Sequence, residues 1–554
     1  MPRYALGIDF GTLSGRAVLV DVETGEERAT AVCDYAHGVI DEILPATGRK
    51  LPPDWALQDP ADYLAALEDI VPRVMRECGA QPEDVVGIGV DFTSCTILPV
   101  RSDGTPLCFE ERWKAEPHAY VKLWKHHAAQ PEANRINELA ERRGEAFLRR
   151  YGGKTSSEWF FAKALQILDE APEVYRAADR IIEAGDWIVW LLTGQERRSA
   201  CQAGYKGLWS AEDGFPSRDF LAELHPELAD IVDTKMSREI HPVASRAGEL
   251  TAGMADRLGL RAGTPVAVAS IDAHVAVPAC GVTRPGTMVM IMGTSTCHMA
   301  LSGEPRVFEG LAGYVRDGII PGYFGFEAGQ SCVGDHFAWF VERCMPADYA
   351  AEAGRLGISG HELLSRKASE QKPGESGLLA LDWWNGNRSV LMDADLTGLM
   401  IGMSLTTRPE EMYRALIEAT AFGTLVIINA FADNGVPVDD IVACGGLAEK
   451  NPLLMQIYAD VTGREFKIAA SGQAVALGSA MFGAVAAGRA GGGFDTMDEA
   501  AAKMARLKEE RYRPIPENHE VYRRLFAEYL KLHDYFGRGA NDVMKTLKAM
   551  RHGS

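Results

Sequence analysis

Short apolar runs at the start of the chain predict a group of strands. Residues 4–9 and 16–22 are two such runs, joined by a turn from Gly11 to Gly15. Thr24-Gly25-Glu26 then turns the chain into a third run at about 29–33. We expect these three segments to form a β-meander.

A helix and a buried strand are predicted next. Asp59-Pro60 opens the helix, because aspartate suits the cap and proline the first turn, and the pattern continues to about Cys78. Residues 85–92, VVGIGVDF, are continuously apolar. Such a run is typical of a strand that is covered on both faces.

The next segments are more polar or less regular. Residues 117–150 are polar and helical, and we expect them to form a surface insertion. Residues 156–172 predict an amphipathic helix with a serine cap, and 186–194 an apolar helix that ends at glycine. Residues 195–220 read as an irregular loop, and a long loop inside a compact domain is usually functional or mobile.

The second half of the chain repeats the opening pattern. Residues 287–301 are again an apolar strand, a Gly-Thr turn and a second strand. A chain of 554 residues exceeds one ordinary core, so we expect two domains, 1–283 and 284–554, separated by the structure-breaking VTRPG segment. Helices are predicted near 331–344, 408–433, 452–463 and 474–490.

Composition and charge exclude several classes of function. The formal net charge is -20 and no long Lys/Arg run is present, which argues against a nucleic-acid binder. Ten scattered cysteines without a C-x-x-C pair favour reduced thiols in a cytoplasmic protein. A signal-peptide pattern and an apolar run of roughly 20 residues are both missing, so no membrane association is expected.

The first candidate for chemistry is the turn between the first two strands. Backbone N–H groups of Gly11 and the hydroxyl of Thr12 suit phosphate oxygens, and Arg16 can reach a phosphate with its planar fork. Asp9 at the end of the strand suits Mg²⁺. An ordinary hairpin with a satisfied aspartate is an equally good interpretation of this motif alone.

Two further turns have similar character. Gly293 and Thr294 follow the first strand of the second half, and Gly445 and Gly446 stand between a strand and a helix, shortly before Asn451. Paired glycines let the backbone approach a flat ligand such as a nucleoside closely. Taken singly, each could be a common hairpin or a glycine turn before a helix.

Asp272 is the candidate that would distinguish a kinase from a plain ATPase. It follows the apolar strand PVAVAS at the junction of the halves, where a carboxylate could act as a base on an acceptor hydroxyl. Aspartate is also a favoured helix cap, and the two roles are compatible. His274, His126 and His127 are interpreted as non-ligands, because no Cys/His/Glu constellation surrounds them.

The three turns occur in the order typical of a known architecture. They resemble the superfamily of sugar kinases, heat-shock 70 chaperones and actin, an α/β fold with two ribonuclease-H-like domains around an ATP and sugar cleft. Within it, nearly the whole chain resembles the FGGY carbohydrate kinase family. The stretches closest to the members that phosphorylate ribulose are DFTSCT (91–96), LWKHH (123–127), GYKGLW (204–209), FEAGQSCVGDHFAWF (326–340) and LDWWNGNRS (381–389).

This resemblance implies an activity, ligands and an assembly. The activity would be ATP-dependent phosphorylation of O5 of L-ribulose, with D-ribulose as a further acceptor, giving ribulose 5-phosphate in L-arabinose breakdown. The protein would use ATP and Mg²⁺, act in the cytoplasm and form a homodimer.

The resemblance also implies roles for individual residues. Asp272 would be the base and, with Asp9, would position Mg²⁺. Sugar contacts would come from Ser94, Lys206, Asp272 and Glu327. Trp124 and Lys125 are secondary candidates near the acceptor. Nucleotide contacts would come from Gly11, Thr12, Arg16, Gly293, Thr294, Gly334, Gly445, Gly446 and Asn451.

Other interpretations remain open at this point. The acceptor could be xylulose, ribitol or glycerol, since the residue types alone do not fix the sugar. An actin- or chaperone-like ATPase switch would need neither Asp272 nor the 204–209 segment. Lys206 could be a solvated loop lysine, and Glu327 could pair with an arginine.

Overall fold

The computed structural model describes residues 2–552 and contains two large mixed sheets. The first, from the N-terminal half, has the order β13-β14-β7-β1-β2-β3, and β15 also pairs with β7. Its strands are β1 (Tyr4–Phe10), β2 (Ser14–Asp21), β3 (Glu27–Asp34), β7 (Val85–Phe92), β13 (Arg246–Glu249), β14 (Pro265–Ala267) and β15 (Ser270–Ile271). The predicted meander and the buried strand at 85–92 are confirmed.

The second sheet repeats the plan of the first. It has the order β18-β19-β17-β16-β22-β23-β24. Strand β16 pairs antiparallel with β17 and parallel with β22, just as β1 pairs antiparallel with β2 and parallel with β7. Its strands are β16 (Gly286–Met292), β17 (Thr296–Ser302), β18 (Gly313–Arg316), β19 (Phe324–Gln330), β22 (Val438–Cys444), β23 (Phe466–Ala469) and β24 (Leu507–Tyr512). The predicted internal repeat is therefore present.

Smaller sheets and many helices complete the two halves. The short strands are β4 (Ile43–Leu44), β5 (Arg49–Lys50), β6 (Leu57–Gln58), β8 (Ile97–Val100), β9 (Val121–Lys122), β10 (Arg180–Glu183), β11 (Arg198–Ser199), β12 (Ile240–His241), β20 (Leu379–Leu381) and β21 (Leu399–Ile401). The first half has α1 (Pro60–Cys78), α2 (Gln130–Arg143), α3 (Phe147–Arg150), α4 (Phe160–Glu170), α5 (Pro172–Ala177), α6 (Ala184–Thr193), α7 (Ala200–Lys206), α8 (Arg218–Leu224), α9 (Ile231–Thr234), α10 (Ala252–Leu258) and α11 (Asp272–Ala279). The second half has α12 (Gly334–Arg343), α13 (Ala347–Leu356), α14 (Gly360–Ser369), α15 (Pro409–Asp433), α16 (Gly446–Lys450), α17 (Pro452–Thr462), α18 (Ala474–Ala487), α19 (Met497–Met504), α20 (Pro516–Gly537) and α21 (Val543–His552).

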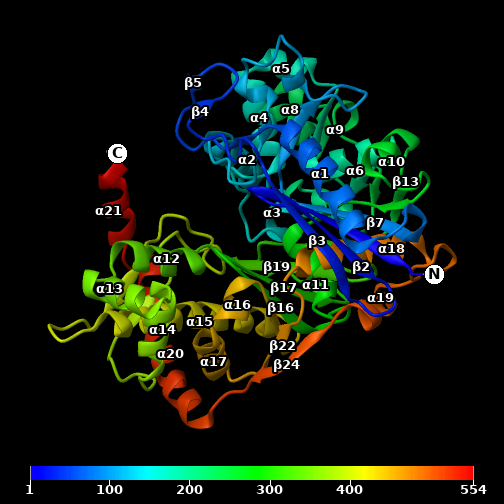
Figure 1. The fold of residues 1–554 in the computed structure, drawn as a ribbon. Coiled ribbons are helices and arrows are strands. Elements are labelled where there is room, and N and C mark those ends of the chain that lie inside the picture. The colour runs from blue at the N-terminus through cyan, green and yellow to red at the C-terminus, as the bar shows by residue number, and fades with distance from the viewer. Residues whose placement is uncertain (1, 553–554) are drawn as a thin grey trace.

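Helix α18 joins the two halves. Although it follows β23 in the chain, it packs against β7 and β1 of the first sheet, and Figure 1 shows it beside β7 among the elements of the first half. The approach is so close that a Cβ at Gly89 would lie 1.8 Å from the carbonyl oxygen of Ser479. Glycine is therefore required at this contact. Buried apolar residues of both halves form one continuous core around α18.

The segment 117–150 differs from the expected surface insertion. Its helices α2 and α3 bury Ile136, Leu139, Phe147 and Leu148 in one core with α4. Most of its charged residues lie on the outer face, although Lys122, Glu132 and Arg150 are buried. These charges dominate the composition and hid an apolar stripe at helical spacing.

Two helix predictions also need correction. Helix α4 begins at Phe160 with no side-chain cap, while the Ser156 hydroxyl accepts a hydrogen bond from the backbone N–H of Glu158 in the turn before it. The predicted loop at 195–220 contains α7, capped by Ser199, which places Lys206 at the end of a helix. A short polar cap and a small-residue helix are weak sequence signals.

The most apolar long helix is α15. By length and composition it could cross a membrane, but 72% of its most apolar 18-residue window is buried inside the protein. It packs against α17, α14 and β20, as the core helix of a folded domain does.

Candidate active site

Three carboxylates meet at the ends of neighbouring strands of the first sheet. Asp9 in β1 lies opposite Asp91 in β7, and Ser270 in β15 also pairs with Asp91. Asp272 follows two residues later, as the first residue of α11. The carboxyl ends of parallel strands therefore bring together Asp9 and Asp272, which were predicted as site residues, and Asp91, which was not.

Burial changes the acid–base properties of Asp9 and Asp91. It raises the pKa of Asp9, against the effect of Arg16, whose Nε lies 3.2 Å from Oδ2 of Asp9. The pKa of Asp91 is held well above its usual range by burial and then by the charge of Asp9. Ser479 of α18 donates to Oδ2 of Asp91 at 2.5 Å, whereas Oδ1 is buried without a hydrogen-bond partner.

Asp91 is the residue that the sequence reasoning missed. A signal for it exists, because the end of VVGIGVDF repeats the end of ALGIDF with the aspartate at the same point of the strand. A parallel pairing of these two strands places both carboxylates at one edge of the sheet.

Asp272 has an environment suited to a base. Burial, and after it the charge of Asp9, raises the pKa of its carboxyl to about 7. Its Oδ1 accepts a hydrogen bond of 2.7 Å from the N–H of Ala273. The cap position of α11 is Ile271, so Asp272 is a first-turn residue and not the predicted cap. A carboxyl group with a pKa near neutrality can accept a proton at physiological pH.

The first phosphate-type turn is present, but the backbone N–H of its glycine, which we expected to be free for phosphate, is used inside the turn. The N–H of Gly11 donates to the carbonyl of Ser14 at 3.0 Å, which closes the turn between β1 and β2. The indole of Trp124 donates to the Thr12 hydroxyl at 3.0 Å, so this hydroxyl can still donate its own proton to a ligand. Arg16 reaches across to Gln473 in the second half, at 3.4 Å.

The second turn brings together Gly293, Thr294 and Gly334. The N–H of Gly293 donates to the carbonyl of Ser295 at 2.9 Å, and the N–H of Gly334 donates to the carbonyl of Gly293 at 3.1 Å. A Cβ at Gly334 would lie 2.6 Å from that carbonyl oxygen, so α12 must start with glycine here. Gly293 and Thr294 are exposed and face open space.

The glycines near Asn451 have different structural roles. Gly445 has φ 93°, and a Cβ there would lie 2.5 Å from the carbonyl oxygen of Met292 at the end of β16. Glycine is therefore required here by the close approach of β16, without any ligand. Gly446 has no atom within 4 Å of a Cβ position and leaves open space at the start of α16. Asn451 caps α17 by accepting a hydrogen bond from the N–H of Leu454 at 3.1 Å.

A buried ion pair joins the halves on the predicted sugar side. Nζ of Lys206 lies 3.1 and 3.0 Å from the two carboxylate oxygens of Glu327, and Nε2 of His274 lies 3.3 Å from Oε2. Burial alone would raise the pKa of Glu327, but Lys206 and His274 together hold it below its usual range. Lys206 is thus not a solvated lysine, and the partner of Glu327 is not an arginine.

Ser94 lies at the end of the first-sheet strand β7. Its hydroxyl oxygen is buried without a hydrogen-bond partner, although the residue itself is partly exposed. An unpaired hydroxyl beside a site is available to a ligand.

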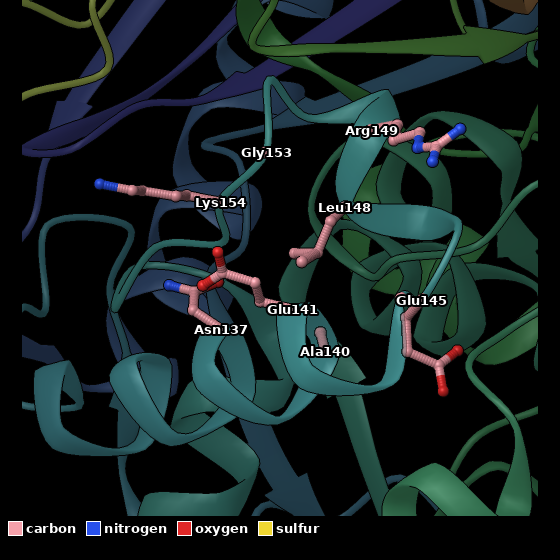
Figure 2. Close-up of a pocket in the computed structure, with 9 residues that line it drawn as sticks. Asn137, Ala140, Glu141, Glu145, Leu148, Arg149, Gly153 and Lys154 are labelled. Carbon is pink, nitrogen blue, oxygen red and sulfur yellow. The ribbon is translucent and has the colours of Figure 1, made fainter.

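A separate open hollow of about 280 Å³ lies between α2 and α3 (Figure 2). None of the predicted site residues lines it. Figure 2 shows Lys154 and Arg149 extending in opposite directions, so its charged side chains do not converge on one point. We do not assign it to the active site.

Comparison with protein families defines the class. The N-terminal domain model of the FGGY family of carbohydrate kinases matches residues 4–278, and the C-terminal domain model of that family matches 288–487. The chain therefore belongs to the FGGY family of carbohydrate kinases.

Curated relatives and solved structures narrow this further. A ribulokinase of Bacillus licheniformis is 58% identical over 540 residues, covering 98% of both chains. A ribulokinase of Mycolicibacterium smegmatis is 51% identical and covers 99% of this chain and 97% of its own. A xylulose kinase structure from Rhodospirillum rubrum has a TM-score of 0.78 at 25% identity, over 96% of this chain and 98% of that one. The expected two-domain α/β fold of sugar kinases is thereby confirmed.

Proposed function

We propose that this chain is a ribulokinase, which transfers the terminal phosphate of ATP to O5 of L-ribulose and releases ADP. The buried Lys206–Glu327 pair beside Asp272 carries the proposal on the structural side, because it offers charged hydrogen-bond groups to sugar hydroxyls. The 58% identity to a ribulokinase over nearly the whole chain supports the same acceptor. D-ribulose is a further acceptor of the same length and terminal hydroxyl.

Asp272 would act on the acceptor. Its carboxylate takes the O5 proton as O5 attacks the terminal phosphorus, the new O5–P bond forms, and the bond from phosphorus to the bridging oxygen of ADP breaks. Lys206, Glu327 and Ser94 would orient the sugar so that only the terminal hydroxyl reaches Asp272.

The two Gly-Thr turns would hold the nucleotide. The hydroxyls of Thr12 and Thr294 and the guanidinium of Arg16 would bind the phosphates. Gly11 and Gly293 would shape the two turns, since their own N–H groups close them. The adenosine would lie against Gly334, Gly445, Gly446 and Asn451. Open space at Gly446 supports this placement, whereas the cap made by Asn451 leaves only its side-chain NH₂ group for a ligand.

Mg²⁺ fits the carboxylates at the strand ends. Asp9 and Asp272 would provide hard oxygen donors. Within residues 2–552 no three His, Cys, Asp or Glu side chains are placed to enclose a metal by themselves, which suits an ion that keeps water and phosphate ligands. When bound, the ion would neutralise phosphate charge.

The assembly and location are proposed by analogy with the family. We propose that domains 1–283 and 284–554 close on the ligands, excluding water from the transferring phosphate, and that α18, which packs on the first sheet, moves with 1–283. A cytoplasmic homodimer is proposed on the same basis.

An acceptor panel tests the substrate. ADP release from Mg-ATP is measured with L-ribulose, D-ribulose, L- and D-xylulose, ribitol and glycerol, and the product is located by ³¹P and ¹³C NMR. We expect kcat/KM for ribulose to exceed the others by at least about tenfold, because a site built around specific hydroxyl contacts rejects epimers. Preference for xylulose or a polyol would overturn the ribulose assignment, and equal ADP release without sugar would indicate an ATPase switch.

A further inference from the structure

Arg388 lies in the loop between β20 and β21, against the end of β19. The N–H of Ser389 donates to the carbonyl of Gly329 at 3.1 Å, and the N–H of Gly329 donates to the Ser389 hydroxyl at 3.2 Å. These reciprocal bonds fix the backbone beside Arg388 to the sheet.

The side chain of Arg388 extends over Gly329. A Cβ at Gly329 would lie 3.2 Å from Cδ and 3.3 Å from Nη1 of Arg388, and 3.2 Å from the carbonyl oxygen of Thr296. Thr296 is the first residue after the Gly293–Ser295 turn. The arginine is thus held at the base of the second phosphate-type turn.

Arg388 is on the face of the sheet that carries the sugar-side ion pair. Glu327 and Gly329 are two residues apart on β19 and therefore point to the same face. Glu327 and Glu158 both act on the guanidinium electrostatically and raise its pKa against the effect of burial. These two carboxylates come from different halves of the chain, so the guanidinium lies between the halves.

Arg388 has no partner of its own. Among the arginines of residues 2–552 that are not exposed, it is the one for which the structure gives no hydrogen bond, ion pair or ring contact. Arg464, which also lacks a carboxylate partner, bonds the carbonyl of Val438. Arg414, by comparison, bonds Glu418 at 2.8 Å and Tyr522 at 2.8 Å. The nitrogens of Arg388 are not among the buried atoms that lack a hydrogen-bond partner, so they stay open to a ligand, and a guanidinium binds anions.

We propose that Arg388 binds the phosphoryl group during its transfer to the sugar, an inference that rests on the proposed kinase function. It stands beside the second phosphate-type turn, which would hold the phosphates of ATP, and on the face of the sheet that carries Glu327. A planar guanidinium can donate two parallel hydrogen bonds to phosphoryl oxygens and stabilise the charge spread over them.

The role predicts a separation between turnover and sugar binding. Arg388→Met keeps an unbranched side chain but removes the charge. It should lower kcat by at least about 100-fold, because loss of one group that stabilises transition-state charge has an effect of this size. The KM for ribulose should change by less than about threefold, because the free sugar carries no anion. Affinity for ribulose 5-phosphate, measured by calorimetry, should fall about tenfold or more.

Two companion measurements distinguish this role from a structural one. Guanidinium ion added at millimolar concentration should partly restore turnover of Arg388→Ala, which lost packing alone would not do. Arg316→Met removes an exposed arginine from the neighbouring strand β18 and should leave kcat unchanged.

The outcomes separate the two proposals. If the wild type phosphorylates ribulose and Arg388→Met matches it in kcat and in affinity for ribulose 5-phosphate, the Arg388 proposal is wrong and the kinase function stands. If the wild type shows no sugar-dependent turnover, the kinase function is wrong, and Arg388 is judged by binding of Mg-ADP with aluminium fluoride. Equal binding by wild type and Arg388→Met would then overturn the Arg388 proposal as well.

Discussion

At the scale of the residue, the contact between Lys206 and Glu327 carries the most information. The two side chains are separated by 121 positions, and both are buried. Buried charges are retained only where partners compensate them. Here His274 adds a third group, and its ring lies tilted against that of Tyr205, with centroids 4.0 Å apart. The arrangement presents paired, oriented donors and acceptors to a polyhydroxy ligand.

Replacement of Lys206 by methionine tests the sugar-side assignment. Lys206→Met removes the charge that holds the pKa of Glu327 low, so the KM for ribulose should rise by at least about tenfold while the KM for ATP changes little. Lys235→Met is the matched control, since this half-buried lysine bonds the carbonyl of Ala178 away from the predicted site residues. Steady-state kinetics with each substrate varied in turn give both constants. A ribulose KM equal to that of the wild type would remove Lys206 from the sugar site.

The sequence identified some of these residues and not others, for physical reasons. Asp9 and Asp272 stand out because a carboxylate at the end of an apolar strand is conspicuous. Asp91 has the same signal but gains meaning only from the pairing of β1 with β7. The unpaired state of Arg388 depends on contacts between segments far apart in the chain, which no local pattern reveals.

At the scale of the element, α18 is the part of the second half that is built into the first sheet. Its small residues allow its backbone to approach β7 and β1 at distances that no Cβ could share. The same helix places Ser479 against Asp91, so it both joins the halves and contributes to the carboxylate cluster. Its composition of alanine, glycine and serine predicted a helix but not the sheet on which it packs.

A single methyl group should disrupt this packing. Gly89→Ala would place a Cβ 1.8 Å from the Ser479 carbonyl oxygen, so we expect a loss of about 3 kcal/mol or more in stability. Gly253→Ala is the control, because no atom lies within 4 Å of its Cβ position in α10, and its effect should stay below about 1 kcal/mol. Urea denaturation of both variants measures the difference. A Gly89→Ala protein as stable as Gly253→Ala would show that α18 does not pack there.

At the scale of the whole molecule, the repeated sheets explain why the proposed site would draw residues from both halves. Each sheet contributes one Gly-Thr turn after its first strand, and the carboxylates come from the first sheet while Glu327 comes from the second. The repeat was readable from the sequence because an apolar strand and its turn are local patterns. The core formed by 117–150 was not, since its buried stripe appears only when α2 packs against α4.

The central claim is that this arrangement transfers phosphate to a sugar with Asp272 as the base. The most direct test is coupled ADP release from Mg-ATP with and without L-ribulose, for the wild type and for Asp272→Asn. We expect release by the wild type to depend on ribulose, and Asp272→Asn to lose at least about 100-fold in kcat while binding ATP as the wild type does, because only proton acceptance is removed. Near-normal turnover by Asp272→Asn, or ADP release by the wild type that is equal without sugar, would contradict the account.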